Sequence, residues 1–172
     1  MSSTERQNAG HTLRPLARTQ PMFHRVLQAE PHDVRRTLKD LRTRFASQVS
    51  ADAMGRLELV LAEVMNNVVE HADLAPQPLP GSMSRSMHLC VVMHDNGLSC
   101  AITDDGGHLP ADCLLPRSLP ALDPLDLPEG GFGWCLIQGL TQSLCYYREG
   151  QRNCLAFMVP YHQSQFSGPI SG

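Results

Sequence analysis

The apolar positions of the chain change their period along its length, and these changes divide it into helices and strands. Across residues 30–45, apolar side chains recur three and four positions apart with arginines between them, after a Glu-Pro-His-Asp stretch that suits a first helical turn. The same period predicts a longer helix from about residue 50 to Ala72 and a third helix over residues 132–142. One face of the longer helix consists of Leu57, Leu61, Val64 and Val68.

Shorter apolar or alternating runs predict strands, which are separated by turn residues. These runs are residues 22–28, 87–94, 98–103, 144–148 and 154–159. The pair Asn96-Gly97 predicts a tight hairpin with positive φ between the second and third runs. Residues 149–151 predict a second hairpin that closes the domain.

Length and composition fit one folded domain with a buried core. The chain has 172 residues, of which 42% are hydrophobic and 18% charged, and this length is too short for two ordinary domains. We expect the domain over residues 21–160, between a flexible leader at residues 1–20 and a flexible tail at residues 161–172. The arginines of the leader also allow a transit peptide. No apolar run approaches the length of about eighteen residues that a membrane-spanning helix needs.

Charge and cysteine content argue against several other classes of protein. The formal net charge is -3, Lys39 is the only lysine, and no segment combines basic with aromatic residues, so nucleic-acid binding has little support. The six cysteines form no CxxC pair and no metal-ligand spacing. We therefore expect free, reduced thiols rather than a disulfide framework.

Residues 107–129 contain too many prolines for a regular element. The prolines are Pro110, Pro116, Pro120, Pro124 and Pro128. A structureless loop of this length in a compact domain is usually functional or mobile. The sequence therefore predicts a mobile lid.

The longer helix carries polar side chains that could hold a metal ion. Glu63, Asn67 and His71 fall on one narrow stripe beside the apolar face, because each is four positions from the next. A carboxylate and an amide oxygen suit a hard cation such as Mg²⁺. For a helix taken alone, a solvated polar face is the more common explanation of such a stripe.

Two glycine-containing segments supply the other parts of a nucleotide site. Asp104 ends a predicted strand and precedes a turn at Gly106, where the backbone could approach a planar ring. Its carboxylate could accept a hydrogen bond from the exocyclic amino group of adenine. Residues 130–133 place unpaired N–H groups at the start of a helix, where phosphate binds well. Taken singly, each segment is also explained by an ordinary turn or loop.

Together these segments resemble a known family, the histidine-kinase-like (GHKL, Bergerat-fold) ATPases. The resemblance spans about residues 20–160 and rests on LAEVMNNVVEHA at residues 61–72, ITDDG at residues 102–106, GGFGWCLI at residues 130–137 and NCL at residues 153–155. The first stretch, through its Glu-His-Ala, is most similar to the stand-alone anti-sigma-factor serine kinases of the RsbW and SpoIIAB type.

The resemblance implies a role for each candidate residue. Asn67 would be the Mg²⁺ ligand, Glu63 the base that accepts the hydroxyl proton of a phosphoryl acceptor, and His71 would lie near the phosphates. Asp104 would bind the adenine amino group and Gly106 would line the base pocket.

The same resemblance places Gly131 and Gly133 around the phosphates, below the lid. His108 stands where this family commonly has the last glycine of a DxGxG motif, and this departure falls at the start of the lid.

The resemblance also implies a fold and a function. The fold would be an α+β, two-layer sandwich with a mixed, mostly antiparallel sheet and three helices on one face. The function would be that of a cytoplasmic, ATP- and Mg²⁺-dependent serine/threonine kinase that phosphorylates an anti-sigma-factor antagonist of the STAS type. It would bind a sigma factor, allow a homodimer, and control transcription by partner switching. The alternative is a nucleotide-responsive binding module that transfers no phosphate.

Overall fold

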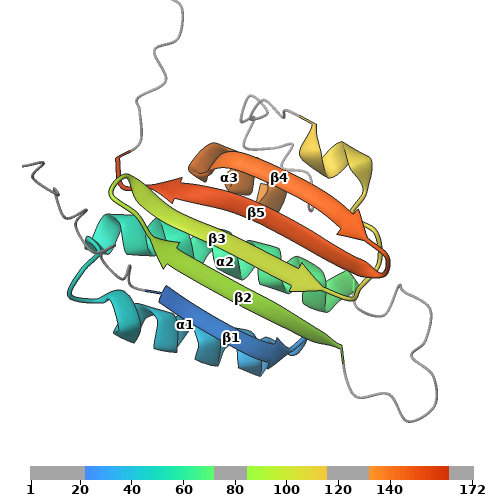
Figure 1. Ribbon diagram of the computed structural model, residues 1–172, viewed down its shortest axis with the longest axis horizontal. Coiled ribbons are helices and arrows are strands. Elements are labelled where there is room, and N and C mark those ends of the chain that lie inside the picture. Colours follow the sequence, from blue (N-terminus) through green and yellow to red (C-terminus); the bar gives the residue numbers. More distant parts are fainter. Residues whose placement is uncertain (1–21, 72–84, 116–131, 163–172) are drawn as a thin grey trace, which may run out of the picture.

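In the described part of the chain, five strands form one sheet, and three α-helices lie on one of its faces (Figure 1). The computed structural model describes residues 22–71, 85–115 and 132–162. The helices are α1 (Pro31–Phe45), α2 (Ala51–His71) and α3 (Phe132–Leu140), with a short 3₁₀ helix, η2 (Ala111–Leu114). The strands are β1 (Met22–Gln28), β2 (Ser86–Met93), β3 (Gly97–Asp104), β4 (Gln142–Glu149) and β5 (Arg152–Pro160). The expected two-layer α+β fold is confirmed.

The sheet has the order β1-β2-β3-β5-β4, and every neighbouring pair is antiparallel. The expectation of a mixed sheet was wrong in this respect. Two helices, α1 and α2, separate β1 from β2, and β2 runs antiparallel to β1. One helix, α3, separates β3 from β4, and these two strands therefore run in the same direction. Because β5 lies between them, no parallel pair forms among the described strands.

The core lies between the helical layer and the inner face of the sheet. Alternate strand residues point into it, among them Leu89, Ile102 and Leu155. On α2 the predicted apolar face is confirmed, because Leu57, Leu61 and Val64 are buried in this core, with Val68 partly buried beside them. This packing fixes the rotation of α2, and with it the direction of the polar stripe that borders the apolar face.

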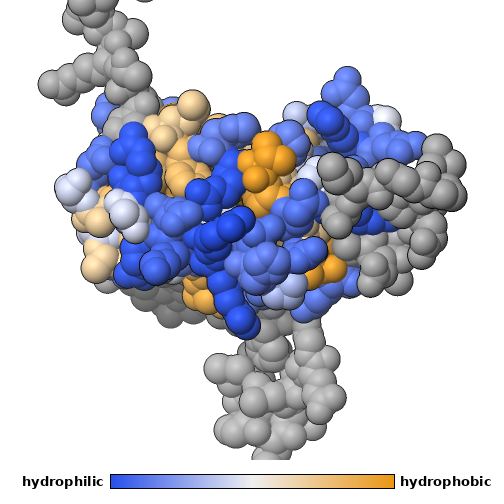
Figure 2. All heavy atoms as spheres, turned by 90° about the horizontal axis from the view of Figure 1, so that it is seen from below, coloured by the Kyte–Doolittle hydropathy of each residue, from blue (hydrophilic) through white to orange (hydrophobic). Residues whose placement is uncertain are grey.

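Helix α1 covers the β1 edge of the core and exposes its basic side chains to water, while its Asp33 is buried. Its exposed residues include Arg35, Arg36, Lys39, Arg42 and Arg44. Seen from below, on the side where α1 and β1 lie, hydrophilic residues cover most of the described surface (Figure 2). Ion pairs from Arg25 of β1 to Asp40 and from Arg42 to Glu58 of α2 join these elements.

The two hairpins use glycine for different reasons. Gly150 has φ of 59°, as the turn between β4 and β5 requires. Gly97 does not have the predicted positive φ. A Cβ at Gly97 would lie 2.5 Å from the carbonyl oxygen of Val159, so glycine is needed there because β5 approaches closely.

Helix α3 ends two residues earlier than predicted, because Gln142 already belongs to β4. The chain enters this edge strand through a register irregularity between Gln142 and Cys145, where Ser143 adopts φ of 56°.

The first part of the predicted lid is structured. Residues 111–114 form η2, Cys113 is buried, and Gln138 of α3 donates from Nε2 to the carbonyl oxygens of Cys113 and Leu115 at 3.0 and 2.9 Å. The expectation of a loop without regular structure was therefore wrong for these residues, because α3 provides the contacts that a loop alone lacks. Residues 116–129 lie outside the described part of the chain, as do the leader and most of the tail.

All six cysteines are free thiols, as expected. Within the described ranges, no helix is long and apolar enough to cross a membrane, and no cluster of three or more metal-ligating side chains is present.

Candidate functional site

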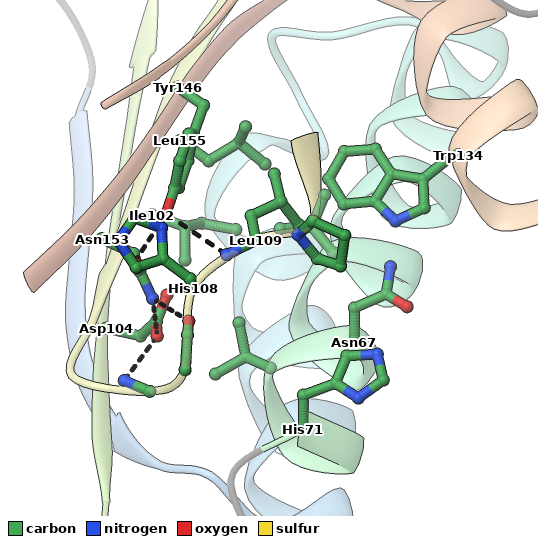
Figure 3. A pocket seen from close by; sticks show the side chains of 15 residues that line it. Asn67, His71, Ile102, Asp104, His108, Leu109, Trp134, Tyr146, Asn153 and Leu155 are labelled. Carbon is green, nitrogen blue, oxygen red and sulfur yellow. Dashed lines mark hydrogen bonds between the residues drawn. The ribbon is translucent and has the colours of Figure 1, made fainter. Parts of the chain in front are cut away.

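One pocket opens between helix α2, the inner face of the sheet and the segment that follows β3 (Figure 3). Asn67 and His71 project from α2 on one side, and Asp104 and Asn153 lie on the sheet opposite them. The apolar part of the lining consists of Val64, Val68, Ile102, Leu109, Pro110, Trp134 and Leu155. The pocket thus combines apolar walls with a few polar groups at two sides, the usual make-up of a small-molecule site.

Asp104 ends β3, and its carboxylate is held in one orientation. Its Oδ1 accepts hydrogen bonds from the backbone N–H of Gly106 and from Nδ2 of Asn153, both at 2.8 Å. No residue in the described ranges donates to Oδ2, so this oxygen is available to a ligand. Burial raises the pKa of the Asp104 carboxyl, and the hydrogen bonds from Asn153 and Gly106 oppose that rise.

Asn153 is a site residue for which the sequence predicted no role. It lies directly opposite Asp104 in the β3–β5 register and opposite Arg148 in the β4–β5 register. Only 6% of the residue is exposed. Its Oδ1 accepts from Nη1 of Arg148 at 2.6 Å and from the hydroxyl of Tyr146 at 2.8 Å. A polar row therefore crosses three strands beneath the pocket.

The segment after Asp104 is fastened to this row. Asn153 donates from Nδ2 to the carbonyl oxygen of Gly107 at 2.8 Å, and Arg148 donates to that of Gly106 at 3.1 Å. The backbone N–H of Leu109 donates to the Tyr146 hydroxyl at 3.3 Å. A Cβ at Gly106 would lie 2.8 Å from Oδ1 of Asp104, so a side chain there would push against the carboxylate.

The helical side of the pocket contains an unsatisfied amide. Nδ2 of Asn67 is buried and has no hydrogen-bond partner within the described ranges. A buried polar atom without a partner costs free energy, and such atoms in native proteins call for an explanation such as a ligand. His71, four residues later at the exposed end of α2, lines the same pocket.

Trp134 forms part of the wall on the α3 side. It is the only tryptophan of the chain, and 9% of it is exposed. The sequence placed it within a matching stretch but gave it no part in the site. An indole beside the cavity offers a flat apolar surface, and we expect its fluorescence to respond to occupancy of the pocket.

Glu63 and Gly133 lie against each other, and neither belongs to the lining of the pocket. Glu63 is on α2 one turn before Asn67, and Gly133 is in the first turn of α3. A Cβ at Gly133 would lie 2.6 Å from Oε2 of Glu63. Gly131 falls outside the described residues. His108, the departure from the family motif, lies at the pocket lining and is exposed.

These groups fit an adenine nucleotide with a bound cation. Asp104 offers an accepting oxygen, as the exocyclic amino group of adenine requires. The apolar walls suit a planar ring, and Asn67 brings an amide whose buried Nδ2 has no partner among the described residues. Four of the residues to which the resemblance assigns a role line this one pocket: Asn67, His71, Asp104 and Gly106.

Comparison with known families identifies the family of this domain. The family described as "Histidine kinase-like ATPase domain" matches residues 27–159. This range includes helices α1, α2 and α3 and all the described strand residues except the first five of β1 and the last of β5. None of the curated proteins compared with the chain matches it. Because the family match covers well over half of the 172 residues, the chain belongs to the histidine kinase-like ATPase family.

Proposed function

We propose that the chain binds Mg²⁺-ATP in this pocket and acts as a regulatory serine/threonine kinase. The observation that carries the nucleotide part is the state of Asp104, whose Oδ1 has two donors while Oδ2 has none in the described ranges. An oxygen presented in this way, beside apolar walls, selects a ring that carries an amino group. The chain's membership in an ATPase family agrees with this proposal.

The metal and phosphates are proposed to bind at the α2 side. The amide of Asn67 would hold Mg²⁺ through its oxygen, and His71 would lie beside the phosphates. The glycines at positions 131 and 133 are proposed to leave room for the phosphates near the start of α3. The cation would neutralise phosphate charge and orient the terminal group, which is most of what phosphoryl transfer requires.

Glu63 is proposed to be the base that takes the proton from the acceptor hydroxyl. Its place one helical turn before Asn67 puts it next to the proposed metal ligand, on the polar stripe of a helix whose rotation the core fixes. The acceptor would be a serine or threonine of an anti-sigma-factor antagonist of the STAS type. This proposal also allows binding of a sigma factor and formation of a homodimer, with partner switching in the cytoplasm. The sequence similarity of residues 61–72 to anti-sigma kinases supports this part.

A second function is a nucleotide-responsive binding module without phosphoryl transfer. One observation favours it. The carboxylate of Glu63 packs against Gly133 and is not part of the pocket lining, so nucleotide could bind without engaging a base.

Nucleotide selectivity tests the first part of the proposal. Calorimetry, checked by Trp134 fluorescence, should show Mg²⁺-dependent binding of ATP and much weaker binding of GTP. In Asp104→Asn, the two donors to Oδ1 hold the new amide oxygen in its place, so the NH₂ group replaces Oδ2 and faces the amino group of adenine. We expect ATP affinity to fall roughly 10- to 100-fold, the range of a hydrogen bond to a charged group. Equal affinity for ATP and GTP would contradict adenine recognition.

Phosphoryl transfer needs the partner protein. Partners captured from the native cell with and without ATP would be incubated with the chain and labelled ATP. Glu63→Gln keeps the size of the side chain and loses its basicity, so ATP affinity should stay close to that of the wild type. Transfer should fall by about 10²- to 10⁴-fold, the usual contribution of a general base. Wild-type protein that binds ATP and partner but transfers no phosphate would support the binding module instead.

A further inference from the structure

Asn153 has each of its hydrogen-bonding positions occupied, and this fixes which end of its amide meets Asp104. Oδ1 accepts from Arg148 and from the Tyr146 hydroxyl, while Nδ2 donates to Asp104 Oδ1 and to the carbonyl oxygen of Gly107. A guanidinium can only donate, so the atom beside Arg148 must be the amide oxygen. The NH₂ group therefore faces Asp104.

This orientation decides what Asp104 can recognise. A donor on Oδ1 favours the ionised carboxylate, whose Oδ2 can then only accept a hydrogen bond. A protonated carboxyl would instead present an O–H donor. A 6-amino purine such as adenine requires an acceptor at this point, whereas a 6-oxo purine such as hypoxanthine or guanine requires a donor.

We propose that Asn153 is a positioning residue that keeps Asp104 ionised with Oδ2 free, and so makes the pocket select a 6-amino purine over a 6-oxo purine. The proposal rests on the proposed nucleotide-binding function. It concerns a residue that acts through Asp104 rather than on the reacting phosphate.

Burial is the main force that Asn153 opposes. Desolvation raises the pKa of Asp104, the hydrogen bonds from Asn153 and Gly106 lower it, and the charge of Asp105 raises it again while that of Arg148 lowers it. The other titratable groups that line the pocket are His71 of α2, His108 of the segment after β3 and Tyr146 of β4. Of the interactions that favour the ionised form of Asp104, the side-chain hydrogen bond from Asn153 lowers its pKa most.

Asn153→Asp gives the sharpest test, because it keeps the size of the side chain and exchanges the NH₂ donor for an oxygen. Nδ2 of Asn153 and Oδ1 of Asp104 are 2.8 Å apart, so the substitution would place two carboxylate oxygens at this short distance. Such a pair of carboxylates must share a proton. The measurement is the ratio of the dissociation constants for ITP and ATP, obtained by calorimetry on the full chain from acidic to alkaline pH. We expect this ratio to fall roughly 10- to 100-fold at neutral pH, as the loss of a charge-assisted hydrogen bond predicts. It should recover as the pH rises and the shared proton leaves.

Asn96→Asp is the matched control. It makes the same change of charge at an exposed position in the β2–β3 turn, at the opposite end of β3 from Asp104. The ITP to ATP ratio of this variant should equal that of the wild type at every pH.

The titration of the Asp104 carboxyl, followed by carbon NMR on the nucleotide-free protein, gives a second readout. In Asn153→Asp, one proton of the pair should persist to a higher pH than in the wild type. If this variant does not fold, Arg148→Gln removes one donor to the Asn153 amide and should move the ratio and the titration in the same direction by a smaller amount.

An unchanged ratio together with an unchanged Asp104 titration in folded Asn153→Asp would overturn the proposal. Wild-type protein that binds neither ATP nor ITP would overturn the proposed function. The titration would still decide whether Asn153 controls the protonation of Asp104.

Discussion

Gly133 in the first turn of α3 lies against the carboxylate of Glu63 in α2, so closely that a Cβ on Gly133 would come within 2.6 Å of Oε2. The contact joins the proposed general base to the helix that follows the glycine-rich stretch. It means that the position of this base depends on how closely α3 packs against α2.

Gly133→Ala should therefore displace Glu63 without removing it. The new methyl group occupies the space of the carboxylate oxygen, and a misplacement of about 1 Å can reduce the rate of a catalysed step by roughly 10²-fold. We expect a loss of that order in phosphate transfer to the partner protein. The double variant Gly133→Ala, Glu63→Gln should lose no more than Glu63→Gln alone, because both changes act on one group. Additive losses would show that Gly133 acts on the nucleotide directly.

The burial of Asp104 predicts how protein stability depends on pH. Because burial raises the pKa of this carboxyl in the folded state, the folded protein holds its proton more tightly than the unfolded chain does. The ionised group thus lowers stability above its folded-state pKa, and this cost disappears as the pH falls below the pKa of the unfolded chain. Asp104→Asn lacks the charge, so it should melt at a higher temperature than the wild type at neutral pH.

The difference in melting temperature between wild type and Asp104→Asn should shrink as the pH falls through that window. Thermal unfolding measured across the acid range provides the check. A variant that is less stable than the wild type at neutral pH, or a difference independent of pH, would contradict this account of Asp104.

Gln138 should control the order of residues 109–115. It donates to two carbonyl oxygens of the segment around η2, and each such bond contributes a net of about 0.5–1.5 kcal/mol. Gln138→Met keeps the length of the side chain and loses both bonds. We expect faster amide hydrogen exchange in residues 109–115 and weaker nucleotide binding, because this segment forms part of the pocket.

Gln48→Met is the control for this change, since Gln48 is exposed and its side chain makes a single long hydrogen bond within the described ranges, to the carbonyl oxygen of Arg44 at 3.5 Å. Its exchange pattern should match that of the wild type. Equal exchange in residues 109–115 of Gln138→Met would show that the packing of η2 suffices without Gln138.

Two glycine substitutions should have opposite effects on stability. Gly55 lies in the interior of α2, and a Cβ there meets no atom within 4 Å, so Gly55→Ala should stabilise the protein by about 0.5–1 kcal/mol. Gly97→Ala should destabilise it, because its Cβ would lie 2.5 Å from the backbone carbonyl oxygen of Val159. Thermal unfolding of both variants tests this pair. Destabilisation by both would indicate that α2 needs Gly55 for a contact not provided by the described residues.

The positions of the helices and strands were determined by the sequence itself, because hydrophobic period and turn residues act over short distances. Residues 51–71 follow a helical period that their own side chains impose, and the helix begins where this period predicted, at Ala51. The chemistry of Asp104 and Asn67 was also visible, because a carboxylate after a strand and an amide on a polar stripe are local features. The same reasoning failed at Gly97, where the constraint is the backbone of a strand sixty residues away in the sequence, at Val159.

The tertiary structure alone decided which residues meet at the site. The pairing of β3 with β5, rather than with β4, places Asn153 opposite Asp104 and Arg148 behind it. No local pattern encodes that register, because it depends on which strand inserts between β3 and β4. The packing of α3 on α2 likewise sets Gly133 against Glu63, two residues far apart in the chain. Local periodicity thus specifies the elements, whereas the order and register of the strands specify the hydrogen bonds that hold the site.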